Sequence, residues 1–70
     1  MKNGWHKVGD ALVFVRNNVI TELLMKDSRG DWCPRTIMRF NSELKVWQRT
    51  GMVTVDALRA GCRRGTICVR

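Results

Sequence analysis

The dipeptide Asn17-Asn18 constrains the fold of this chain more than any other feature. It separates two runs that are rich in β-branched and large apolar residues, Ala11–Arg16 and Val19–Met25. β-Branched residues favour strands, and asparagine tolerates the positive φ angles that a two-residue hairpin turn requires. Residues 12–25 are therefore predicted to form an antiparallel β-hairpin.

A helix from Asp10 to Lys26 is the alternative for the same segment. Asp10 would be its N-cap. The apolar residues at helical spacing would be Leu12, Val15, Val19 and Leu23. Two asparagines at its centre and five β-branched residues weaken such a helix. The hairpin is the favoured interpretation.

Turn residues divide the next part of the chain into short strands. The cluster Asp27–Asp31 is typical of a turn, and Asn41–Glu43 is a second one. Pro34 delays the start of the strand that follows it, because proline cannot donate to a strand ladder. The further strands predicted in this way are Arg35–Phe40, Leu44–Arg49 and Thr66–Arg70.

One short helix is predicted near residues 54–60. Thr54 is a suitable N-cap, and Asp56 lies near the positive end of the helix dipole. Gly61 is expected to end the helix as its C′ residue. Gly61 and Gly65 then bracket Arg63-Arg64 in a tight turn.

The expected order is four meandering strands, the short helix and a fifth strand. This order resembles the Src-homology-3-like small barrel, in which one short helix separates the fourth and fifth strands, and the resemblance rests on element order alone. It implies a mainly-β single domain over residues 1–70, built as a five-stranded antiparallel sheet or small barrel. Barrels of this kind bind peptides or nucleic acids and include some enzymes, so the fold alone does not assign a function.

The charge of the chain points to an anionic partner. Thirteen Lys and Arg residues against six Asp and Glu give a net charge of +7. Residues 45–70 hold six basic residues and one acidic residue, so the positive charge is concentrated there. Such a balance favours nucleic acid, DNA or RNA, with an acidic protein surface as the alternative partner.

Size and motif content argue against catalysis. Seventy residues bury a thin core and leave little room for a cofactor-sized cavity. The sequence has no phosphate-cradling glycine loop and no carboxylate pair with assignable acid–base roles. We therefore expect a protein that is not an enzyme and binds no cofactor.

The three cysteines, Cys33, Cys62 and Cys68, indicate a reducing compartment. Their number is odd, no Cys-x-x-Cys pair occurs, and their spacing with His6 resembles no zinc finger or ribbon. Free, metal-free thiols in a cytoplasmic protein are expected. The chain also lacks the apolar run of a signal peptide or of a membrane span, so no membrane partner is expected.

Strand alternation predicts a basic face around one tryptophan. A three-residue loop at Asn41–Glu43 would pair Phe40 with Leu44 and Met38 with Val46, which matches apolar with apolar. The opposite face would then place Trp47 and Ile37 among four cations, Arg35, Arg39, Lys45 and Arg49. Cations can neutralise phosphates while a tryptophan stacks on a base. A solvated basic face with no partner is the simpler interpretation.

A second basic cluster lies at Arg59, Arg63, Arg64 and Arg70. The two clusters together predict a non-enzymatic nucleic-acid-binding accessory or regulatory module, with Trp47 as a stacking residue. The alternative is a protein-interaction module, an adaptor or inhibitor that docks an acidic partner. In that case Trp47 and Ile37 would be the buried anchors and the arginines a steering rim.

Overall fold

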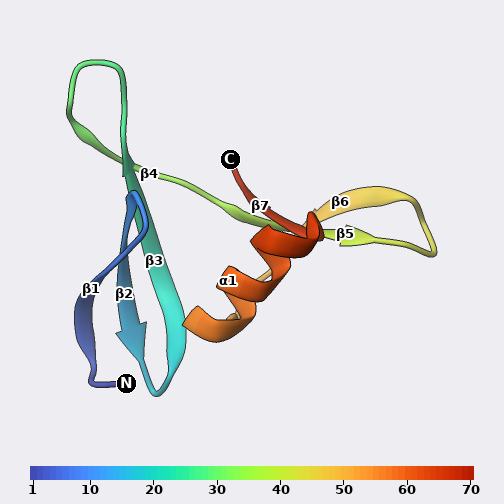
Figure 1. Cartoon of the computed structure of the whole chain (residues 1–70), viewed down its shortest axis with the longest axis horizontal. Coiled ribbons are helices and arrows are strands. Elements are labelled where there is room, and N and C mark those ends of the chain that lie inside the picture. Colours follow the sequence, from blue (N-terminus) through green and yellow to red (C-terminus); the bar gives the residue numbers. More distant parts are fainter.

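The computed structural model describes residues 1–70 as two antiparallel β-sheets with one α-helix between them (Figure 1). Its strands are β1 (Gly4–Val8), β2 (Ala11–Arg16), β3 (Val19–Lys26), β4 (Trp32–Pro34), β5 (Ile37–Asn41), β6 (Val46–Arg49) and β7 (Ile67–Val69). The helix α1 (Val55–Arg64) precedes β7 in the chain. The first sheet has the order β1-β2-β3-β4 and the second has the order β6-β5-β7.

The hairpin at the centre of the first sheet is the one that the sequence predicts. β2 pairs with β3 in antiparallel register, and Asn17 and Asn18 between them have φ angles of 53° and 65°. Turns with two such angles match the twist of the flanking strands. Alternate residues of β2 then point into the core, where Val13 and Val15 are fully buried. The helical alternative for this segment is wrong.

The chain passes from the first sheet to the second between two adjacent residues. The Arg35 N–H donates to the Leu23 carbonyl of β3 over 2.9 Å. The Thr36 N–H instead donates to the Arg70 carbonyl over 2.6 Å, and the Arg70 N–H donates back over 2.8 Å. Arg35 therefore extends the first sheet, whereas Thr36 belongs to the ladder of the second.

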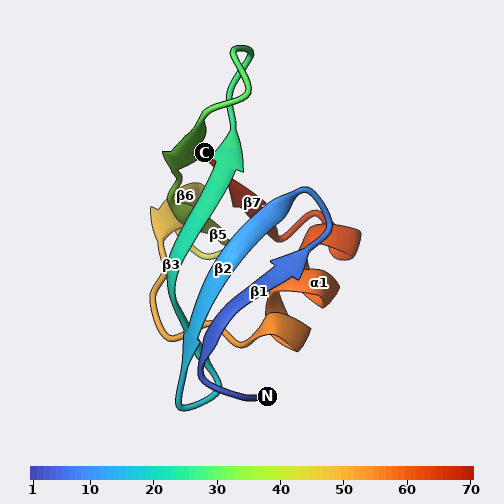
Figure 2. The same ribbon diagram turned by 90° about the vertical axis from the view of Figure 1, so that its left-hand side faces the viewer.

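The expected five-stranded sheet or closed barrel is not formed. Two strands, β1 at residues 4–8 and β4 at residues 32–34, add to the five predicted, and the chain changes sheet between Arg35 and Thr36, so there are seven strands in two sheets. Both sheets keep unpaired edges. Figure 2 shows β1, β2 and β3 in front of α1 and of the second sheet. One cluster of eleven buried apolar residues, to which both sheets and the helix contribute, holds these layers together.

The helix begins where predicted and ends later. Thr54 is its N-cap, and its hydroxyl accepts from the Ala57 N–H over 3.1 Å. The helix continues through Gly61 and ends at Gly65, which has a φ of 75°. The expectation that Gly61 ends the helix is therefore wrong. Arg63 and Arg64 lie in its last turn and not in a loop. Their positive charges there interact favourably with the negative, C-terminal end of the helix dipole.

Gly61 is needed inside the helix because the second sheet approaches it closely. A Cβ atom at this position would lie 2.7 Å from the Ile67 Cβ and closer still to the outer atoms of that side chain. Gly61 and Ile67 are both buried. The absent side chain therefore sets the distance between α1 and β7.

The β3–β4 turn extends away from the body of the molecule (Figures 1 and 2). The Asp27 Oδ1 accepts from the Arg29 N–H over 2.8 Å and from the Asp31 N–H over 3.0 Å. The Cys33 Sγ–H donates to the other carboxylate oxygen over 3.4 Å. The hydrogen bond from the Asp31 backbone is the main reason that the pKa of Asp27 is below its ordinary value of 3.8. The hydrogen bond to Asp27 raises the pKa of the Cys33 thiol.

Replacing Gly61 by alanine should destabilise the protein. Alanine normally stabilises a helix interior by about 1 kcal/mol relative to glycine, but here its Cβ overlaps Ile67. We expect Gly61→Ala to lower the free energy of unfolding by about 1–3 kcal/mol, as overpacked cores do. Urea denaturation of both proteins measures this. The same change made in an Ile67→Ala background should be less destabilising, and a single variant as stable as the wild type would contradict the close approach.

Protonation of Asp27 should weaken the β3–β4 turn. Because the folded pKa lies below the unfolded value, the carboxylate stabilises the fold above that unfolded value, and this contribution is lost as the pH falls through the folded pKa. The difference in unfolding free energy between the wild type and Asp27→Ala should be constant near neutral pH. It should shrink below about pH 4. Thermal unfolding of both proteins across this range tests the expectation, and a difference that grows on acidification would contradict it.

Candidate functional site

The loop of the β5–β6 hairpin is longer than the predicted three-residue loop at Asn41–Glu43. Four residues, 42–45, separate the two strands. The Asn41 Oδ1 accepts from the Glu43 N–H over 3.0 Å and from the Leu44 N–H over 3.1 Å. Lys45 completes the turn with a φ of 56°. An asparagine that bonds its own following backbone in this way fixes the loop and, with it, the strand register.

The predicted register of β5 and β6 is therefore wrong. Phe40 lies opposite Trp47, and Met38 lies opposite Arg49. Directly opposed residues share a face of an antiparallel pair. Trp47 thus shares its face with Phe40 and not with Ile37, which is buried in the core on the other side.

Strand β7 adds to the same face on the other side of β5. Cys68 lies opposite Met38, and the bonded pair Thr36 and Arg70 continues this register. We call the resulting surface the Trp47 face; it consists of Thr36, Met38, Phe40, Trp47, Arg49, Cys68 and Arg70. It carries two arginines and no carboxylate side chain.

Two aromatic rings form the centre of the Trp47 face. The rings of Phe40 and Trp47 meet edge to face, with centroids 5.4 Å apart and planes at 63°. The Arg70 guanidinium carbon lies 5.7 Å from the Trp47 ring centroid, within the range of a cation–π contact. Phe40 is 36 % exposed and Trp47 is half-buried. The two rings are thus packed against each other and remain partly accessible to solvent.

The helix forces this face outward. α1 packs on the opposite side of the second sheet, where Gly61 meets Ile67 and where Ile37 is also buried. Strand alternation then sends the side chains of Phe40 and Trp47 away from the helix. Trp47 thus lies on the outer face of the sheet, as predicted, although its neighbour across the strand is Phe40 and not Ile37.

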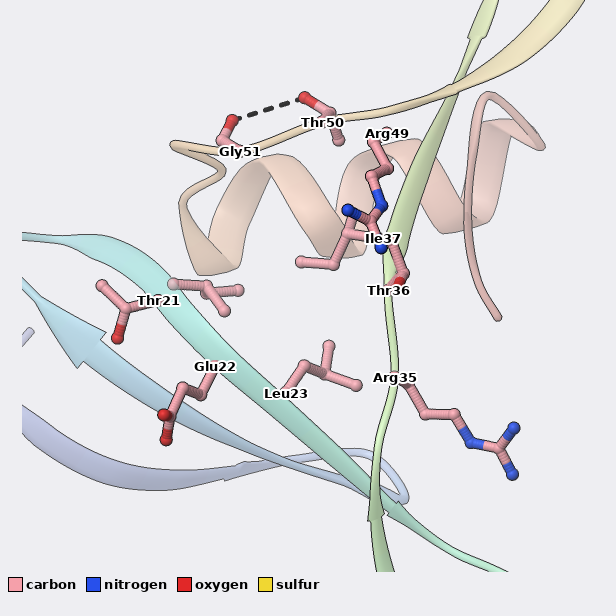
Figure 3. Close-up of a pocket in the computed structure, with 10 residues that line it drawn as sticks. Thr21, Glu22, Leu23, Arg35, Thr36, Ile37, Arg49, Thr50 and Gly51 are labelled. Atoms are coloured by element: carbon pink, nitrogen blue, oxygen red, sulfur yellow. Dashed lines mark hydrogen bonds between the residues drawn. The ribbon is translucent and has the colours of Figure 1, made fainter.

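The four cations expected around Trp47 are separated in the structure. Only Arg49 shares its face; Arg39 lies on the helix side of the second sheet, opposite Gln48, and Lys45 lies in the loop. Arg35 and Arg49 line one cleft of about 330 Å³ between β3 and β5. In Figure 3 the Arg35 side chain extends away from Leu23.

The arginines of the helix form a separate group. Arg59 and Arg63 line a groove between α1 and the first sheet, and Arg64 is exposed in the last turn. Because α1 and the Trp47 face lie on opposite sides of the second sheet, Arg59, Arg63 and Arg64 are separate from Trp47. Of the second predicted cluster, only Arg70 lies on the Trp47 face.

Phe40 and Arg70, the two residues that contact the Trp47 ring, are absent from the predicted basic face. Phe40 is assigned there to the core side of the hairpin, and Arg70 to the C-terminal cluster. Asn41 at the start of the loop is the signal that could have placed Phe40, because an asparagine that caps its own turn allows a four-residue loop. No comparable local signal marks Arg70, since its position depends on a long-range pairing with Thr36.

A second exposed aromatic surface lies on the first sheet. Trp5 and Phe14 pair across β1 and β2 with ring centroids 5.2 Å apart, and Lys26 lies 5.3 Å from the ring centroid of Trp32. Glu22 lies opposite Phe14 and places a carboxylate on this surface. We call it the Trp5 face.

The cysteines and the histidine lie apart. All three thiols are free, and no three of the His, Cys, Asp and Glu side chains are grouped as metal ligands. The His6 Nε2 lies 2.6 Å from the Lys2 carbonyl oxygen. Cys62 is exposed on the helix, whereas Cys33 and Cys68 are half-buried.

Truncation of Trp47 should leave the protein folded. Its ring is half-buried and packs mainly on Phe40 and Arg70, so Trp47→Ala should lower the free energy of unfolding by about 1–2 kcal/mol. Deletion of a core aromatic costs about 3–5 kcal/mol. Urea denaturation measures this change in the free energy of unfolding. Phe40→Ala, which removes the other ring of the pair, is measured in the same way. Loss of the cooperative transition in Trp47→Ala would show that this ring belongs to the core.

Comparison with known proteins assigns no family to this chain: no family model, curated protein or solved structure matches it. Its single helix has ten residues and is neither long nor apolar enough to cross a membrane.

Proposed function

We propose that the protein binds single-stranded nucleic acid through the Trp47 face, as a non-enzymatic accessory or regulatory module. The observation that carries this proposal is the outward-facing pair of the exposed Phe40 and the half-buried Trp47, which lies with Arg49 and Arg70 on a sheet face without a carboxylate side chain. Bases that have left a duplex can stack on aromatic side chains of this kind, and arginines beside them can contact the phosphates.

The geometry of the aromatic pair suits stacking on one base or two. The edge-to-face contact with Phe40 holds the Trp47 ring in place without covering both of its faces. Arg70 covers part of that ring, and a base would either displace the guanidinium or stack beside it. Stacking contributes about 1–3 kcal/mol per base and tolerates any sequence.

The arginines of this face are free to contact phosphate. Arg49 and Arg70 are exposed, and no side-chain hydrogen bond of the structure uses an arginine guanidinium. The net charge of +7 attracts any polyanion and accelerates its approach. The candidate cations outside this face, Arg35, Arg39, Lys45, Arg59, Arg63 and Arg64, would contribute to this field rather than to the central contact.

The Trp5 face is the less suitable of the two aromatic surfaces. Glu22 lies directly opposite Phe14 there and would repel a phosphate that follows a stacked base. Trp5 itself is 46 % exposed and is also paired edge to face with a phenylalanine. It therefore provides a matched control for Trp47.

Loss of stacking should weaken binding of a labelled oligothymidylate of about 12 nucleotides. We expect Trp47→Ala to reduce the affinity about 5- to 150-fold, which corresponds to the ~1–3 kcal/mol of one stacked base. Fluorescence anisotropy at two salt concentrations measures the affinity and its salt dependence. If two phosphates are neutralised, Arg49→Gln with Arg70→Gln should reduce the slope of log K against log salt by about 1.4.

Trp5→Ala should leave the affinity for oligothymidylate and the salt dependence of that affinity unchanged. Equal losses in Trp5→Ala and Trp47→Ala would contradict a site on the Trp47 face. Absence of binding to both oligothymidylate and oligouridylate at low salt would contradict the proposed function. It would favour the alternative, in which the same face docks an acidic protein surface.

A further inference from the structure

An open groove runs between α1 and the inner side of the first sheet. Its volume is about 760 Å³, and seven of its eleven lining residues are hydrophobic. Its apolar lining includes Val8, Ala11, Leu23, Met25, Leu58 and Val69. Pockets of roughly 300–1,000 Å³ are the size that holds small molecules. The groove has a volume in this range, but it is open to solvent and is not an enclosed cavity.

The groove exists because the helix covers only part of the sheet. Val13 and Val15 are fully covered in the core. Met25 and Val69 pack against that core but stay half-buried. The thin core thus continues into a concave apolar surface that no segment of the chain fills.

Charged side chains at this groove have an excess of one positive charge. Arg59 and Arg63 are four residues apart on α1 and therefore lie on the same side of the helix. Asp10, in the turn between β1 and β2, is the only acidic residue that lines the groove. Neither guanidinium takes part in a side-chain hydrogen bond. One carboxylate would balance this charge.

We propose that the groove binds an amphiphilic monocarboxylate with a hydrocarbon chain, such as a medium-chain fatty acid. The chain would lie on the apolar floor and remove Met25 and Val69 from water. The carboxylate would accept hydrogen bonds from Arg59 and Arg63, whose planar guanidinium groups match its geometry.

The dimensions of the groove favour a small ligand over a protein. Stable protein interfaces engage about 20–30 residues on each side, whereas eleven residues line this groove. None of them is aromatic, so the groove offers no platform for a nucleic-acid base. The site is also separate from the Trp47 face, because α1 lies on the other side of the second sheet. The inference is thus independent of the proposed nucleic-acid function.

Decanoate below its micelle concentration is a suitable probe, and decanol is its uncharged counterpart. Titration of the ¹⁵N-labelled full chain should shift the amide resonances of Ala11, Leu58 and Cys62 and leave those of Phe40 and Trp47 in place. We expect decanoate to bind at least tenfold more tightly than decanol. Arg59→Gln with Arg63→Gln removes both charges and keeps the apolar floor, so it should abolish this difference.

A matched double variant removes two cations elsewhere. Arg16 and Arg29 are exposed at the end of β2 and in the β3–β4 turn. Arg16→Gln with Arg29→Gln should keep the preference for decanoate. Equal affinities of decanoate and decanol in the wild type would overturn the proposal, and so would shifts confined to the Trp5 face or an absence of shifts.

The Cys62 thiol gives a second measurement on the unmodified protein. Cys62 is exposed and lines the groove, whereas Cys33 and Cys68 lie outside it. Saturating decanoate should slow alkylation of Cys62 by iodoacetamide at least fivefold and leave the other two rates unchanged. An unchanged alkylation rate at Cys62 would show that decanoate does not occupy the groove, even if amide resonances shift in the titration.

Discussion

The change of hydrogen-bonding partner between Arg35 and Thr36 determines the architecture. Arg35 is bonded to β3, whereas Thr36 is bonded on both its N–H and its carbonyl to Arg70. The N–H groups of two consecutive residues are thus bonded to different sheets, and the chain passes from one sheet to the other at this point. A second link, from the Ile20 N–H to the Val53 carbonyl over 2.8 Å, holds the segment before the helix against the first sheet. The helix is therefore confined to the space between the sheets.

This arrangement gives the two sides of the second sheet different roles. The side that faces α1 is committed to the core, because Gly61 lets the helix backbone approach Ile67 closely. The other side has nothing packed upon it, so its aromatic residues, Phe40 and Trp47, meet solvent. Placement of Arg59 and Arg63 on the helix separates them from this surface and brings them to the groove. The basic residues are thus divided between two chemically distinct surfaces, one aromatic and one aliphatic.

Local signals in the sequence were sufficient for the parts of the fold that depend on neighbouring residues. The Asn17-Asn18 turn predicted the hairpin, and Thr54 predicted the start of the helix, because each acts on backbone groups a few residues away. The end of the helix was missed because Gly61 serves a contact with Ile67, not a turn. The two-sheet arrangement was missed because the partner of Thr36 is thirty-four positions away, at Arg70. Neither Gly61 nor Thr36 differs locally from an ordinary helix stop or strand residue.

The candidate site was predictable only in part for the same reason. Alternation along β6 correctly placed Trp47 with Arg49 and apart from Val46. The residues opposite β6 depend on the length of the loop between β5 and β6. The four-residue loop changes the strand register, so that Phe40 and not Ile37 lies opposite Trp47. Matching apolar with apolar residues chose the wrong loop because Leu44 is not a strand residue, and its side chain is 62 % exposed.

The tip of the β3–β4 hairpin has a consequence for how this chain can be modified. Ser28, Arg29 and Gly30 are exposed and extend beyond the sheets, and the bonds that close the turn converge on Asp27. Lengthening a flexible loop costs only about 0.6 kcal/mol for each doubling of its length. The core contacts of β2, β5 and α1 lie elsewhere. This tip is therefore the point at which an inserted peptide or a new pair of chain ends would disturb neither sheet surface nor the groove.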